Sequence, residues 1–110
     1  MLAKIELFRV RDDIDEKCDL SNLNFDFVRH AFPNLKKELK TYYLIIYDFD
    51  QDYNDSKSSV DKYYILDKIE NQFKLNPPSD FKGKLQYSDI VKINDDQVFF
   101  YDSHGWFELE

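Results

Sequence analysis

The stretch TYYLIIYDFD, residues 41–50, carries the strongest strand signal in the chain. β-branched and aromatic side chains dominate it, and these types favour a pleated sheet. Its middle, YYLIIY at 42–47, is apolar on both faces of an extended backbone. A strand with two apolar faces is typical of the interior of a sheet. We therefore predict that residues 41–49 form a central strand.

The segments before this stretch predict one further strand and two helical pieces. AKIELFRV at 3–10 alternates, with Ile5 and Leu7 on one face and charged side chains on the other, as a half-buried strand does. A charged loop is expected over 11–22, and apolar residues at near-helical spacing follow up to Phe32. PNLKKELK at 33–40 predicts a short helix, because Pro is well tolerated at the first helical position.

The segments after it predict a loop, a helix and a meander. QDYNDSKSS at 51–59 is typical of a mobile polar loop. Residues 65–74 carry the apolar stripe of an amphipathic helix, which Pro77 and Pro78 bring to an end. Three short strands should follow, and Gly105 suits a turn that needs a positive φ. The strand segments are YSDIVKI, QVFFYDS and WFELE.

These elements predict one α+β domain over residues 1–110. We expect a mainly antiparallel, twisted sheet of four to five strands with two to three short helices. The length of 110 residues and the 43% hydrophobic content are sufficient for one core. The single Cys18 excludes an internal disulfide and cannot by itself build a zinc site. No apolar run approaches the roughly 20 residues that span a bilayer, so we expect a cytoplasmic protein without a signal peptide.

The charge balance favours a basic partner. The chain has 22 acidic and 15 basic residues, a formal net charge of −7. Such a field repels nucleic-acid phosphates and attracts basic surfaces, so no direct contact with nucleic acid is expected. The same balance also occurs in proteins that are acidic merely for solubility.

Four carboxylates follow the predicted central strand, at Asp48, Asp50, Asp52 and Asp55. Their spacing is similar to the start of a calcium loop. Counted from Asp48, however, the sixth residue is Tyr53 instead of Gly, and the twelfth is Ser59 instead of Glu, so the sharp turn and the bidentate ligand are missing. We predict no metal site here. The carboxylates form either a solvated strand end or a surface that matches a row of Arg or Lys.

No complete catalytic motif is present. Asp80-Phe81-Lys82 has the Asp-x-Lys spacing of metal-dependent nucleases, which also need a second carboxylate on a facing strand. A metal-dependent nuclease is therefore one alternative function. His30 and His104 show no recognisable arrangement with Ser or Cys. We predict no cofactor and no catalytic residue.

The closing stretch FFYDSHGWFELE, residues 99–110, contains the only Trp of the chain. Consecutive aromatic residues either fill the core on both faces of a sheet or leave one face exposed. Trp106 is thus a core residue or an interface anchor. Both alternatives remain open from the sequence.

Residues 65–110 resemble the YodL-like family. The resemblance rests on a helix with Leu66, Asp67, Ile69 and Phe73, and on three later motifs. The motifs fall on Pro78, Asp80, Phe81 and Gly83, on Ser88, Asp89, Ile90 and Val91, and on Tyr101, Asp102, Ser103, Gly105 and Trp106. The first 64 residues are similar to the family only loosely. The resemblance implies an accessory protein of plasmids, conjugative elements or phages; some similar small proteins are type II-A anti-CRISPRs.

The resemblance and the charge together predict an anti-defence protein. We expect an inhibitor of a Cas9-type effector that occupies a basic surface otherwise filled by guide RNA or DNA. A metal-dependent nuclease that acts on guide RNA is one alternative, and a regulatory or structural module of a conjugative element is another. The predicted partner-binding residues are Asp48, Asp50, Asp52, Tyr53, Asp55, Trp106, Glu108 and Glu110.

Overall fold

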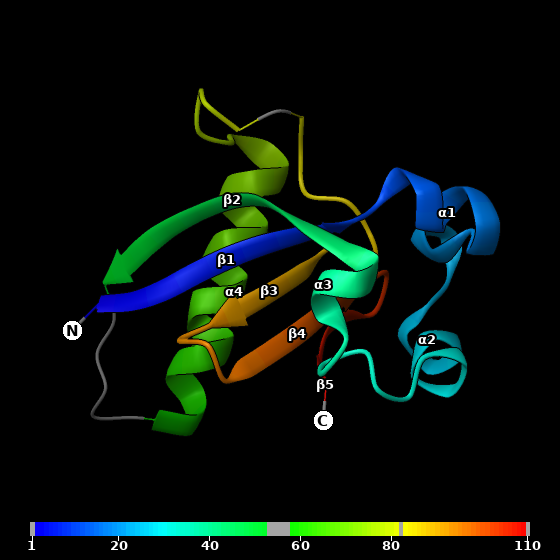
Figure 1. Ribbon diagram of the computed structural model, residues 1–110. Helices are drawn as coiled ribbons and strands as arrows, with labels where there is room; N and C mark the ends of the chain where they lie inside the picture. The colour runs from blue at the N-terminus through cyan, green and yellow to red at the C-terminus, as the bar shows by residue number, and fades with distance from the viewer. Residues whose placement is uncertain (1, 53–57, 82, 110) are drawn as a thin grey trace.

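A five-stranded antiparallel sheet organises the chain, with strand order β2-β1-β3-β4-β5 (Figure 1). The structure, a computed structural model, describes residues 2–52, 58–81 and 83–109. This architecture confirms the predicted α+β class. The strands are β1 (Leu2–Val10), β2 (Tyr43–Asp52), β3 (Ile90–Ile93), β4 (Gln97–Asp102) and β5 (Gly105–Leu109). The helices are α1 (Asp12–Cys18), the 3-10 turn η1 (Leu20–Asn22), α2 (Phe25–Ala31), α3 (Leu39–Tyr42) and α4 (Ser58–Leu75).

Helices cover both faces of the sheet. The long helix α4 packs on one face, where its buried residues meet Ala3, Ile5 and Leu7 of β1. On the other face, Phe8 and Val10 of β1 belong to a second apolar cluster with residues of η1, α2 and α3. Figure 1 shows α4 behind the sheet and the shorter helices gathered towards one end of β1. The residues of α4 in the first cluster are Ile65, Leu66, Ile69 and Phe73, the four that the helical stripe predicted.

The predicted central position of strand 41–49 is wrong: β2 lies at the edge of the sheet and pairs with β1 alone. Its two-sided apolarity has a different cause. Tyr43 packs into the cluster below α3, whereas Ile46 and Tyr47 turn towards the α4 side, because a bulge opposite Leu7 and Phe8 shifts the alternation.

β1, which was predicted to be half-buried, is an interior strand, as are β3 and β4. It pairs with β2 on one side and β3 on the other. Its residues Ala3, Ile5, Glu6, Leu7, Phe8 and Val10 are all buried. The charged side chains of this strand predicted one solvent-exposed face. The sequence pattern shows the polarity of a segment, but it does not show which elements pack on either face of the strand.

Other predicted elements are partly right. The expected charged loop at 11–22 contains α1 and η1; α1 buries no residue, so it has no apolar stripe that a sequence could reveal. The segment 33–38 forms turns and the helix begins only at Leu39, although the predicted pair Leu35 and Leu39 is indeed buried.

The polar loop predicted over 51–59 is wrong at both of its ends. Its first two residues belong to β2 and its last two to α4, and residues 53–57 lie outside the described part of the chain. The predicted helix 65–74 is confirmed within α4, and the C-terminal meander is confirmed as β3, β4 and β5. Gly105 has a φ of +117°, as the turn required. Among the described residues, no helix combines the length and the apolarity that a membrane crossing needs.

Candidate partner-binding surface

Asp48 and Asp50 stand side by side on the edge strand β2. Both are exposed, and both belong to the alternate set of β2 residues that points away from α4. The residues between and before them, Phe49 and Tyr47, pack against the α4 cluster instead. The period of two along a strand thus gathers these carboxylates on one face. Of the four carboxylates predicted to form a binding surface, the structure describes the side chains of these two.

Their neighbours carry two acidic and two basic side chains, so the negative balance of this part of the sheet comes from Asp48 and Asp50 themselves. Asp48 is paired in register with Glu6, and Asp50 with Lys4. The ammonium of Lys4 lies 4.0 Å from a carboxylate oxygen of Asp95, which Lys92 also approaches to 4.0 Å. One carboxylate is thus shared between the two nearest lysines, and the local balance stays negative. We refer to Asp48, Asp50 and Glu6 on this face as the acidic face.

The other predicted contacts do not join the acidic face. The side chain of Asp52 and the whole of Tyr53, Asp55 and Glu110 lie outside the described residues. Trp106 and Glu108 belong to β5, the opposite edge, with β1, β3 and β4 in between. At about 4.8 Å per strand, the two edges are about 19 Å apart. Trp106 and Glu108 also point to the α4 side, since their partners Tyr101 and Phe99 belong to that cluster.

Trp106 packs as a core residue along one of its sides. It is half-buried, and its ring lies 4.6 Å from that of Tyr101, centroid to centroid. Its indole Nε1 is buried, and no hydrogen-bond acceptor among the described residues pairs with it. On the opposite face of β5, the ring of Phe107 stacks on Phe25 of α2 at 4.8 Å.

The motif that begins with Ser88 and Asp89 is buried and connects the start of β3 to β1 and β2. The Asp89 carboxylate accepts hydrogen bonds from Arg9 and from the backbone N–H of Gln86. Burial raises the pKa of Asp89, and the hydrogen bonds and charge of Arg9 offset part of that rise. The carbonyl of Ser88 accepts a hydrogen bond of 2.7 Å from the hydroxyl of Tyr43, whose pKa burial raises.

The motif at residues 101–106 contains Asp102, which stabilises a turn and the start of a helix. Its carboxylate accepts from the backbone N–H of His104 at 2.7 Å and from that of Phe25 at 2.9 Å. Asp102 thereby fixes the turn before β5 and the start of α2. Ser103, which follows it, is exposed.

The motif of Pro78, Asp80, Phe81 and Gly83 contacts α4 through Phe81 and β2 through Asp80. Phe81 is buried and meets Phe73 of α4 edge to face at 4.9 Å. The Asp80 carboxylate accepts a hydrogen bond of 2.9 Å from Tyr47, and this bond raises the pKa of the tyrosine. Gly83 has a φ of +80°. Lys82 of the Asp-x-Lys tripeptide lies outside the described residues, and the described ones contain no group of three His, Cys, Asp or Glu side chains that could hold a metal.

Two residues that carry this network, Arg9 and Tyr43, were not singled out from the sequence. The only available signal was weak: an Arg within the apolar alternation of ELFRV. Its partner Asp89 is 80 positions away, and no local pattern connects them.

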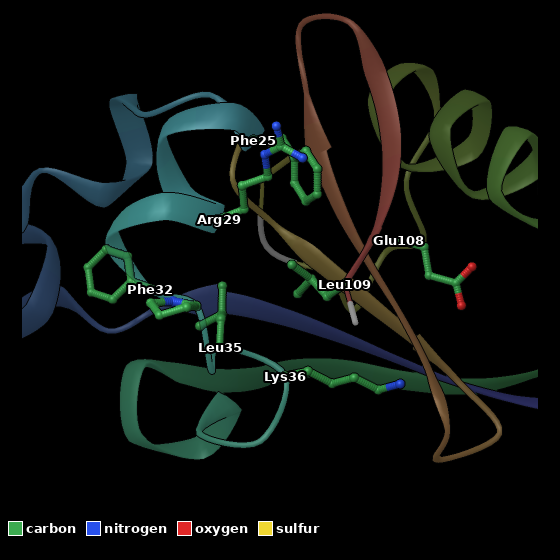
Figure 2. A pocket seen from close by; sticks show the side chains of 8 residues that line it. Phe25, Arg29, Phe32, Leu35, Lys36, Glu108 and Leu109 are labelled. Carbon is green, nitrogen blue, oxygen red and sulfur yellow. The ribbon is translucent and has the colours of Figure 1, made fainter.

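A pocket of about 310 Å³ lies between α2, the 33–38 turns and the end of β5. Figure 2 shows Phe25, Leu35 and Leu109 gathered there, with Arg29 close to the ring of Phe25. Arg29 forms an ion pair with Asp26 at 2.9 Å. The pocket adjoins the edge strand β5, whereas the acidic face includes the other edge strand, β2. Its lining residues are Phe25, Arg29, Phe32, Pro33, Leu35, Lys36, Glu108 and Leu109.

The chain matches no family model, no curated protein and no solved structure. The resemblance to the YodL-like family therefore rests on the motifs of residues 65–110.

Proposed function

We propose that the chain is an anti-defence protein of a phage or mobile genetic element: an anti-CRISPR inhibitor of a type II-A Cas9 that acts in the host bacterial cytoplasm. It would bind a basic surface of the effector that otherwise holds guide RNA or DNA. The observation that supports this proposal best is the pair of exposed carboxylates at Asp48 and Asp50, on an edge strand of a chain with a net charge of −7.

In this mechanism, the carboxylates of the chain compete with nucleic-acid phosphates for Arg and Lys side chains of the effector. Arg and Lys side chains that bind phosphates also form short, charge-assisted hydrogen bonds with carboxylates. The acidic charge of the chain raises the rate of encounter with such a surface. Nucleic acid and the chain then exclude each other, and no bond has to be made or broken. The resemblance to accessory proteins of mobile elements supports a defence system as the setting of this competition.

A capture experiment tests the proposal. The immobilised chain is offered purified type II-A Cas9, with and without guide RNA, and the bound protein is measured by mass spectrometry. We expect capture of the free effector and reduced capture of the guide-loaded one. Failure to capture Cas9 in either state would contradict the proposal. Capture of a protein of a conjugative element from a host lysate instead would favour a regulatory module.

A charge-matched pair of variants connects the result to the acidic face. Asp48→Asn with Asp50→Asn removes the two carboxylates of β2. Asp12→Asn with Asp67→Asn removes two exposed carboxylates from α1 and α4. Because the net charge changes equally, general electrostatic attraction falls equally in both. We expect several-fold weaker capture for the first variant only.

A further inference from the structure

Along residues 43–50, the outer edge of β2 has no strand partner in the described part of the chain. Within the described residues, β1 is the only strand that pairs with β2, and no other segment forms a backbone hydrogen bond with residues 43–50. The strand has ten residues, YLIIYDFDQD, without Lys or Pro. Natural proteins usually protect an open edge with charged side chains, bulges or Pro, because such an edge is a template for another strand. The protection on β2 is a bulge and the exposed carboxylates of Asp48 and Asp50, which repel an acidic strand and attract a basic one. β2 therefore offers an accessible row of backbone donors and acceptors.

The hydrogen bonds of Lys4 identify which backbone groups face outwards. Lys4 N–H donates to the Asn94 Oδ1 at 2.8 Å, and its carbonyl accepts from Asn94 N–H at 2.9 Å, so both groups point towards β3. In an antiparallel pair, hydrogen-bonded and non-hydrogen-bonded positions alternate. Asp50, the register partner of Lys4 in β2, therefore turns its own N–H and C=O away from β1.

The same alternation applies to Asp48, which is opposite Glu6. Glu6 lies two residues after Lys4, so its backbone groups also point towards β3. Asp48 and Asp50 thus combine two properties: an exposed carboxylate on the acidic face and a free backbone edge. Phe49, between them, directs its backbone to β1 and its ring to the α4 side.

We propose that β2 binds its partner by strand addition, in which an extended segment of the partner pairs with the outer edge at Asp48 and Asp50. This rests on the proposed function, for which it names the mode of docking. Side chains that face each other across a β pair share one face of the sheet and lie about 4.5–5.5 Å apart. The fitting segment therefore places Lys or Arg opposite Asp48 and Asp50, with an apolar residue between them next to Phe49.

A second copy of the chain does not fit this edge. Pairing of β2 with β2 would bring carboxylates of the two copies close together, and like charges on facing positions destabilise a β pair. The apolar end of the strand, with Leu44 57% and Ile45 47% exposed, lies beyond the bulge and outside the regular ladder of 47–52. A basic strand from another protein neutralises the carboxylates and uses the free backbone groups.

Amide exchange tests this directly. The probe is a synthetic peptide of about eight residues in which Lys and Val alternate; the control peptide has the same composition with Lys and Val in separate blocks. With the alternating peptide, we expect the amide protons of Asp48 and Asp50 to exchange at least about tenfold more slowly in ¹⁵N-edited NMR. The alternation directs those of Tyr47 and Phe49 towards β1, so their exchange should not change. Equal binding of the block peptide without this protection would overturn strand addition.

A pair of variants separates backbone from side chain. Asp48→Asn and Asp48→Pro each remove one carboxylate, but only Pro removes the outward N–H, at an edge position where Pro is tolerated. We expect the Pro variant to bind the alternating peptide about tenfold more weakly than the Asn variant. Circular dichroism checks the fold, and the exchange experiment decides the matter if the Pro variant does not fold.

Three outcomes have distinct meanings. Equal affinities of the folded Asn and Pro variants would overturn strand addition and leave the inhibitor proposal standing on its carboxylates. A dimer formed through β2, detected by light scattering without peptide, would also overturn it. Amide protection by the peptide without any capture of Cas9 would support strand addition and contradict the proposed function alone.

Discussion

The guanidinium of Arg9 binds the carboxylate of Asp89 with two hydrogen bonds, Nε to Oδ1 at 3.0 Å and Nη2 to Oδ2 at 2.8 Å. The Asp89 side chain is 1% exposed and that of Arg9 23%. This pair connects β1 to the residue directly before β3, its neighbour in the sheet. Arg9 also donates to the carbonyl of Lys84 at 3.0 Å. One side chain therefore fixes the sheet and the segment that leads into it.

Replacement of Arg9 by Leu should destabilise the fold strongly. It leaves the buried Asp89 carboxylate without its cation, a change that costs about 3–5 kcal/mol in buried pairs. Because Arg9 is partly exposed, we expect a loss of about 3 kcal/mol in the free energy of unfolding, measured in urea. Arg9→Lys should recover only part of it, since an ammonium cannot form the two parallel bonds. Full stability of Arg9→Leu would show that the pair does not hold the sheet.

The loss in Arg9→Leu should depend on pH. Burial already raises the pKa of Asp89 above 3.8 in the folded chain, and Arg9 is a group that lowers it. Without Arg9, the folded pKa rises further above the unfolded value, so the folded state binds the proton more tightly. Stability of the variant then falls as the pH rises through this window. We expect the difference from wild type to be smaller at pH 4 than at pH 7; an equal difference would refute this account.

Tyr43→Phe tests the hydrogen bond to the Ser88 carbonyl. The buried hydroxyl donates to that oxygen at 2.7 Å. Its removal leaves a buried acceptor without this donor, which costs about 1–3 kcal/mol. Tyr64→Phe removes a hydroxyl from an exposed side chain and should change the free energy of unfolding by less than about 0.5 kcal/mol. Similar values for both variants would mean that water replaces the lost donor.

Trp106→Ala should affect stability and leave partner binding to the remaining folded protein unchanged. The ring is half-buried against Tyr101 and lies on the opposite edge from the acidic face. Large aromatic truncations in cores cost about 3–5 kcal/mol, and partial exposure places this one at the lower end. Thermal unfolding and Cas9 capture, both on folded material, measure the two effects. A stable variant that no longer captures Cas9 would identify Trp106 as the interface anchor.

Purified chain should leave guide RNA intact in the presence of magnesium or manganese. The Asp80 carboxylate is held by Tyr47, and an inhibitor works without cleavage. Gel electrophoresis of labelled RNA provides the measurement. Metal-dependent cutting that disappears in Asp80→Ala and in Lys82→Ala would establish the nuclease alternative.

Local signals in the sequence were sufficient for the types of several elements. The stripe of Ile65, Leu66, Ile69 and Phe73 has the helical period, and the closing strands are separated by turn residues such as Gly105. Both signals depend on neighbours within one turn or one hairpin. The sequence also indicated that Asp48 and Asp50 share one face of β2, because residues two positions apart on a strand point to the same side.

Only the tertiary structure determined the order of the strands and the membership of the site. Whether a strand lies inside a sheet depends on long-range partners, so the charged β1 became an interior strand and the apolar β2 became an edge. Arg9 and Asp89 meet across 80 positions. The same strand order places Trp106 and Glu108 at the opposite edge of the sheet from Asp48 and Asp50. The sequence could not predict this separation, because the types of side chain in a strand do not determine which edge of the sheet it occupies.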